Sequence, residues 1–100
     1  LKVYEALIPI KDKKYKFVST FTDSFVNEIA DYITSKYKSD VSMVINTKYN
    51  KVSFRRQDGV DLHLGELAQK LARGGGHPYS AGGDLTEDFL NFSKCFQPVK

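Results

Sequence analysis

Runs of apolar residues divide the first half of the chain into two strands and a helix. Val3–Ile10 and Tyr15–Phe21 are rich in β-branched and other apolar residues, and the charged segment Lys11–Lys13 separates them, which predicts a hairpin. From Asp23 to Tyr37 the apolar residues recur at helical spacing. We therefore expect an amphipathic helix over this range, with Asp23 or Ser24 available as its N-cap.

The second half predicts a strand pair followed by two short helices. Val41–Ile45 and Lys51–Arg55 favour β-structure, and the five residues between them are typical of a hairpin loop. Asp61 is available to cap a helix whose apolar face comprises Leu62, Leu64, Leu67, Ala68 and Leu71. Thr86, followed by Glu87 and Asp88, predicts the start of a short closing helix within residues 84–96.

A glycine-rich stretch separates these two helices. Residues 73–83 contain five of the seven glycines in the chain. Because glycine is unfavourable in the interior of helices and strands, we expect a loop of special shape here. Strands, helices and this return segment together predict one domain over residues 1–100, of the α+β (α/β-like) class, with a mixed sheet and two or three packed helices.

Composition narrows the functional classes only slightly. Lys and Arg exceed Asp and Glu by three, an excess that tolerates anionic ligands without indicating a bulk nucleic-acid binder. Neither a signal peptide nor a membrane span is apparent, and we read the chain as a fragment of a longer protein. The single cysteine, Cys95, predicts a reducing, cytoplasmic setting, and we expect an inert, partly buried thiol with no role.

The glycine cluster and a neighbouring strand end carry the candidate chemistry. Gly74, Gly75 and Gly76 leave successive backbone N–H groups available for an anion-binding nest, and phosphate is the obvious anion. His77 closes the cluster with a side chain that can donate a hydrogen bond to a phosphate oxygen. Arg55 and Arg56 must point to opposite faces of their strand, so only one can reach this site. We choose Arg55, because Ser53 on the same face adds a second donor.

The segment from Val52 to Gly83, VSFRRQDGVDLHLGELAQKLARGGGHPYSAGG, resembles a known family. It is similar to the C-terminal DHH-associated domain (subfamily 1) of DHH phosphoesterases, whose pattern is a serine-x-arginine strand, a helix and GGGHxxAAG. Such domains occur in oligoribonucleases that also act on nucleoside bisphosphates, in cyclic dinucleotide phosphodiesterases and in RecJ-type exonucleases. The resemblance implies that Arg55 and His77 hold substrate phosphate, with Gly74, Gly75 and Gly76 as the loop.

Three departures from the family pattern surround the motif. Arg73 stands where many members have a fourth glycine, Ser80 replaces the first alanine, and Arg56 follows Arg55 where serine is common. Arg73 either adds a phosphate contact or complements the dipole at a helix end. Tyr79 either stacks on a base or packs as a cover over the loop. His63, opposite the leucine face of its helix, is expected to be solvated and to hold no ligand.

The resemblance also implies partners that this sequence does not contain. DHH phosphoesterases hydrolyse with two divalent ions, usually manganese, held by several Asp and His ligands. The sequence has no DHH triplet and only two histidines, so no metal site or catalytic residue is expected here. The ligands are expected on an N-terminal DHH catalytic domain of the same chain, with a nucleotide or short single-stranded nucleic acid as substrate. The alternative is a non-catalytic tRNA-binding module related to the C-terminal domain of alanyl-tRNA synthetases.

Overall fold

Seven strands form one mixed sheet in a computed structural model that describes residues 1–100. The strand order is β5-β6-β4-β3-β2-β1-β7. The elements in chain order are β1 (Val3–Ile10), β2 (Lys13–Thr22), α1 (Val26–Tyr37), β3 (Val41–Asn46), β4 (Lys51–Arg56), α2 (Leu64–Ala72), β5 (Gly75–Gly76), β6 (Ser80–Asp84), α3 (Glu87–Ser93) and β7 (Gln97–Pro98). This single α+β domain with a mixed sheet and three helices confirms the predicted fold class.

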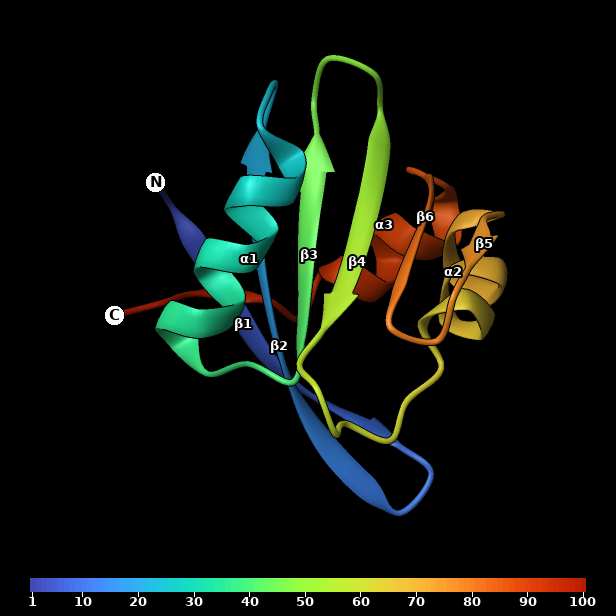
Figure 1. The fold of residues 1–100 in the computed structure, drawn as a ribbon. Helices are drawn as coiled ribbons and strands as arrows, with labels where there is room; N and C mark the ends of the chain where they lie inside the picture. The colour runs from blue at the N-terminus through green and yellow to red at the C-terminus, as the bar shows by residue number, and fades with distance from the viewer.

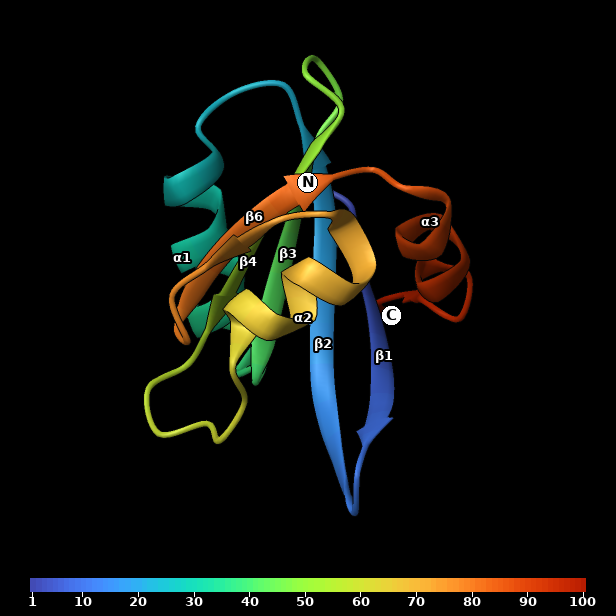
Figure 2. The same ribbon diagram turned by 90° about the vertical axis from the view of Figure 1, so that its right-hand side faces the viewer.

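The helices cover the sheet from both sides. Figure 1 shows α1 in front of the central strands, and Figure 2 shows α1 and α3 on opposite sides of the sheet. On the α1 side the core consists of Val3, Val18, Ala30, Ile33 and Val44. On the other side a larger cluster joins the sheet to α2 and α3 around the fully buried Phe17, Phe54 and Phe89. The alternation of buried residues along β2 and β3 therefore contributes side chains to two separate cores.

The chain path follows from the pairing of neighbouring strands. β1 and β2 form the predicted hairpin, and Lys11 takes a left-handed conformation with φ 59° at its turn. β2 and β3 are parallel, so the chain must cross over between them, and α1 makes this connection. β4 returns antiparallel to β3, as the predicted second hairpin requires.

Two predicted helix caps are wrong. Ser24 Oγ donates to Asp23 Oδ1 (3.2 Å), and α1 begins at Val26, after Phe25, which takes the N-cap position with φ 56° and makes no side-chain cap. Asp61 does not cap α2, because Arg56 donates to the carbonyls of Val60 (2.7 Å) and Leu62 (3.0 Å) and holds this segment as a loop. The helix instead begins after His63, whose Nδ1 accepts from the amide of Glu66 at 3.1 Å. His63 is exposed as expected, but as a capping residue.

The glycine-rich stretch forms two strands, where a loop was predicted. β6 pairs antiparallel with β4, and β5 pairs antiparallel with β6. The glycines allow α2 to approach this edge closely, since a Cβ at Gly83 would lie 2.5 Å from the carbonyl oxygen of Ala72. Tight packing of a helix against these strands therefore outweighs the low β-propensity of glycine.

The C-terminal segment places its aromatic rings inward and its thiol outward. Phe92 and Phe96 pack edge-on against Phe17, with ring centroids 5.8 and 6.5 Å away. Cys95 is exposed, so the expectation of a partly buried thiol is wrong. Phe92 and Phe96, which flank Cys95, fill the core at this end of the chain without it.

No helix in the chain has the length and apolar character that crossing a membrane requires.

Thr86 caps α3 as predicted, and replacing it should measurably destabilise the fold. Its Oγ1 accepts from the amide of Phe89 at 3.1 Å and also donates to the carbonyl of Leu71, which ties α3 to α2. We expect Thr86→Ala to lower the free energy of unfolding by about 1–2 kcal/mol in a urea denaturation curve. Thr47→Ala, at an exposed turn, is the control and should cost less than about 0.5 kcal/mol. Equal losses in the two variants would contradict this role.

Candidate phosphate-binding face

Beyond α1, the edge strands β6 and β5 have one face that no helix covers. α1 packs against β2, β3 and β4, whereas α2 packs against β4, β5 and β6 from the other side. Figure 1 shows β6 and α2 at this edge, with α1 set apart from them across β3 and β4. The surface beyond α1 is therefore open, and the residues that it presents are set by strand alternation.

Strand register brings residues from three segments into two rows on the open face. Ser53 of β4 pairs with Gly82 of β6, which pairs with Gly75 of β5. Arg55 pairs with Ser80, and the amide of His77 donates to the Ser80 carbonyl at 2.8 Å. Paired residues share a face, and the intervening Val52 and Phe54 are buried in the opposite core. Arg55 and His77 thus occupy the two ends of one row that runs through Ser80.

The fold requires two of the three consecutive glycines. A Cβ at Gly74 would overlap the backbone of Gly82, and one at Gly76, which has φ 143°, would lie 2.7 Å from the Ser80 carbonyl oxygen. A Cβ at Gly75 would meet nothing within 4 Å. The fold therefore explains glycine at positions 74 and 76, whereas at position 75 it leaves the residue type unexplained.

The structure does not form the anion-binding nest that the glycine run predicts. The amide of Gly74 donates to Ala68 (3.1 Å), the amide of His77 donates to Ser80, and Gly75–Gly76 form an extended strand. A nest needs successive free N–H groups on curved backbone. The extended, paired backbone does not meet these conditions, and Gly75 is the one of the three glycines that has open space where a side chain would be.

The short connection between β5 and β6 is fixed to the start of α2. The carbonyl oxygens of His77 and Pro78 accept from the amides of Gly65 (3.1 Å) and Leu64 (2.8 Å). These amides belong to the first turn of α2, where backbone N–H groups have no hydrogen-bond acceptor within the helix. Above this anchored backbone the rings of His77 and Tyr79 stack, with centroids 5.3 Å apart and planes 6° from parallel. The stack limits the orientations available to the exposed imidazole.

The two adjacent arginines point to opposite faces, as strand geometry predicts. Arg55 Nη1 forms an ion pair with Asp31 Oδ1 (2.5 Å), and its Nη2 donates to Asn27 Oδ1 (3.2 Å), both on α1. Arg56 turns to the other side, where it holds the loop before α2, and its Nε is buried without a partner. Arg55 is therefore the arginine at the open face.

A polar hollow of about 330 Å³ adjoins Arg55 at the end of β4. It has no apolar residue in its lining, which comprises Asp31, Thr34, Ser35, Arg55, Arg56, Gln57 and Asp58. Sequence reasoning missed Asn27, Asp31 and Ser80 as neighbours of the site. The i, i+4 spacing of Asn27 and Asp31 indicates that they share one face of the helix, but nothing in the sequence shows that this face meets Arg55.

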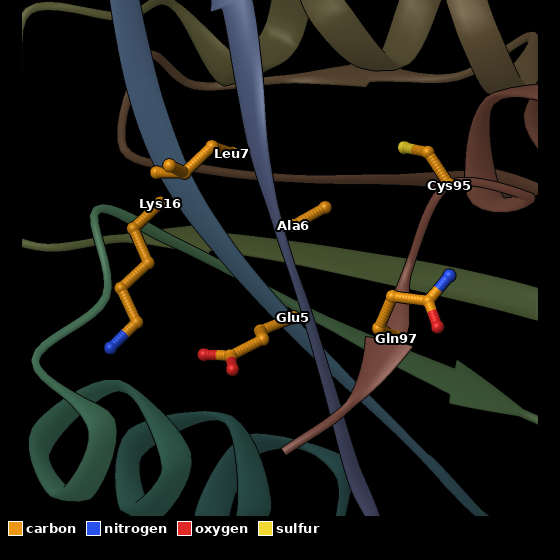
Figure 3. Close-up of a pocket in the computed structure, with 6 residues that line it drawn as sticks. All are labelled: Glu5, Ala6, Leu7, Lys16, Cys95 and Gln97. Carbon is orange, nitrogen blue, oxygen red and sulfur yellow. The ribbon is translucent and has the colours of Figure 1, made fainter. Parts of the chain in front are cut away.

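Arg73 lies apart from the row of Arg55 and His77. It is the C-cap of α2 with φ 50°, and it lines a small hollow with Glu87 and Asp88 at the start of α3. Of the two roles left open by the sequence, this position favours a charge at a helix end. Another hollow, of about 560 Å³, lies at the opposite edge of the sheet and is lined by Glu5, Ala6, Leu7, Lys16, Cys95 and Gln97 (Figure 3). None of the predicted site residues reaches it.

No three His, Cys, Asp or Glu side chains gather closely enough in this chain to hold a metal ion. The groups that the open face does offer are a guanidinium, an imidazole and two serine hydroxyls, all of which can donate hydrogen bonds to an anion.

Comparison with known proteins places the chain in a family. The profile of the DHHA1 domain matches residues 12–96. Among solved structures, an uncharacterized protein from Helicobacter pylori G27 superposes with a TM-score of 0.58 and 24% identity, over 73% of this chain and 21% of that one, and supports the fold alone. This chain thus spans about a fifth of that protein. No curated protein matches. The chain belongs to the DHHA1 family, the DHH-associated domain of DHH-family phosphoesterases.

Proposed function

We propose that this chain is the substrate-binding domain of a DHH phosphoesterase that acts on nucleotides or short single-stranded nucleic acid. The observation that carries the proposal is the row of Arg55, Ser80 and His77 across an uncovered sheet face. Adjacent strands lie about 4.8 Å apart, so the backbones of Arg55 and His77 are separated by about 10 Å. The Arg55 guanidinium is held beside α1 at one end of this row and the His77 imidazole lies at the other end, and we propose that one phosphate group binds between them.

The chemistry of the row suits phosphate. A guanidinium offers donors in a planar fork that matches two phosphate oxygens, and an imidazole N–H adds a donor from the other end. Ser53 and Ser80 contribute hydroxyl groups on the same face. In our proposal the phosphate lies against Gly75, where the absence of a side chain lets the ligand approach the backbone.

Tyr79 extends this site toward the base of a nucleotide. Tyr79 is 54% exposed, and one face of its ring stacks on His77. Aromatic side chains commonly stack on bases in sites for single-stranded nucleic acid. We propose that the free face of Tyr79 receives the base, while its other face orients His77.

Hydrolysis requires a second domain in this proposal. Two divalent ions, of which manganese is the expected kind, would be held by an N-terminal DHH domain of the same chain and would supply activated water. This domain would orient the substrate and neutralise its phosphate charge. We further propose a cytoplasmic location, because the exposed single thiol of Cys95 suits a reducing compartment.

Calorimetric titration of the purified domain tests the proposal. We expect binding of nucleoside monophosphates, bisphosphates and short oligonucleotides, no binding of the matching unphosphorylated nucleosides, and no hydrolysis with added manganese. Strict dependence on the phosphate would support the row as the binding element. Equal binding of nucleosides and nucleotides would contradict it. Binding of structured RNA alone would favour the tRNA-binding alternative, and robust hydrolysis by a contaminant-free sample would refute the two-domain division of labour.

A further inference from the structure

Helix α1 presents two hydrogen-bond acceptors to the same guanidinium. Asn27 and Asp31 lie one turn apart on α1, and they accept from Nη2 (3.2 Å) and Nη1 (2.5 Å) of Arg55. We propose that Asn27 and Asp31 are positioning residues that orient Arg55 for phosphate. This inference rests on the proposed function, because it assigns Arg55 a ligand.

Because the contacts of Arg55 are divided between two residues, they indicate that α1 orients the guanidinium. They do not indicate that a side chain of α1 occupies the place of the phosphate. A carboxylate that stood in for phosphate would take both terminal nitrogens itself, in the bidentate arrangement that arginine and carboxylates favour. Here the two nitrogens go to two different residues, and one of these, Asn27, carries no charge. Two separate attachment points fix the plane of the guanidinium, whereas one point would leave it free to rotate.

The remaining donors of Arg55 are the ones available to a ligand. A guanidinium has five N–H groups, of which α1 uses two. The Nε–H and one hydrogen on each terminal nitrogen remain, because the hydrogen bonds of Arg55 to α1 come from Nη1 and Nη2. In our proposal the edge formed by Nε and one terminal nitrogen binds two phosphate oxygens, while α1 holds the other end of the guanidinium.

Holding Arg55 in advance should improve binding because a free arginine side chain loses rotamer entropy when a ligand orders it. The Arg55 side chain is 28% exposed, whereas that of Asp31 is 69% exposed. The Arg55 side chain is thus partly sheltered beside α1, while the carboxylate that holds it stays hydrated. Hydration weakens the repulsion between Asp31 and a bound phosphate. We therefore expect that orienting Arg55 strengthens phosphate binding by more than the negative charge of Asp31 weakens it.

The test is a calorimetric titration of this domain with adenosine 5′-monophosphate. Asp31→Ala and Asn27→Ala should each weaken binding by about three- to tenfold, the effect of losing one orienting hydrogen bond. Asp31→Asn keeps an acceptor oxygen and should restore affinity to within about twofold of wild type. In an Arg55→Lys background, Asp31→Ala should have no effect, because an ammonium has no plane to orient. Glu28→Ala, an exposed carboxylate on the same helix, is the charge control and should not weaken binding.

Two results would overturn the inference while leaving the proposed function intact. Tighter binding in both Asp31→Ala and Asp31→Asn would mean that Asp31 competes with phosphate. An equal loss from Asp31→Ala in the wild-type and Arg55→Lys backgrounds would mean that Asp31 acts through the stability of α1. If Arg55→Ala itself leaves affinity unchanged, Arg55 is not a phosphate ligand, and both the proposed site and this inference fail.

Discussion

Replacing Gly75 with valine is expected to abolish nucleotide binding while the domain stays folded. A Cβ at this position meets no atom within 4 Å, and Gly75 lies outside the positive-φ region, so a branched residue fits the strand. The new side chain would project onto the open face beside Arg55 and His77, where we place the phosphate. Affinity for adenosine 5′-monophosphate should therefore fall by more than about a hundredfold, since the phosphate loses its main contacts together.

Gly74→Ala is the matched comparison one residue earlier. Its Cβ would overlap the backbone of Gly82, so we expect a loss of about 1–3 kcal/mol in the free energy of unfolding, measured by urea denaturation. Gly75→Val should unfold at a urea concentration no lower than wild type. Normal affinity in folded Gly75→Val would contradict the placement of the phosphate. Unfolding of Gly75→Val would contradict the open space at this position.

Arg55→Ala is expected to weaken phosphate binding by about ten- to a hundredfold, the value of one charge-assisted hydrogen-bonding group. Arg55 is the only arginine on the open face, because the neighbouring Arg56 is turned to the loop before α2. Arg55→Lys should recover affinity only in part, since an ammonium supplies charge without the planar fork. His77→Ala should also weaken binding, because it removes the donor at the other end of the row.

Circular dichroism and the midpoint of thermal unfolding should accompany these titrations. The ion pair of Arg55 with Asp31 joins side chains that are partly and largely exposed, so its loss should change stability by less than about 1 kcal/mol. Lys48→Ala removes the same charge from the turn between β3 and β4 and should leave affinity within about twofold of wild type. If Lys48→Ala and Arg55→Ala weakened nucleotide binding equally, Arg55 would contribute only through the net charge of the domain.

Much of the fold could be predicted because its signals are local. The apolar stripe of α1, the two hairpins and the cap at Thr86 each follow from residues within a few positions of one another. Elements that depend on distant partners could not be predicted in this way. β5 and β6 are strands because β4 offers them an edge, and β7 is a strand because it pairs with Tyr4 and Glu5 of β1. Two residues in isolation carry no periodicity that would indicate a strand.

The sequence by itself determined the family motif, the α+β class and the opposite directions of Arg55 and Arg56, since a strand must alternate its side chains. Only the tertiary structure decided which glycines serve packing and which one is free, because this depends on how closely α2 approaches β6. It also decided that α1 holds the guanidinium of Arg55 through Asn27 and Asp31. These residues are more than twenty positions apart in the chain, and their meeting depends on the crossover that lays α1 against β4.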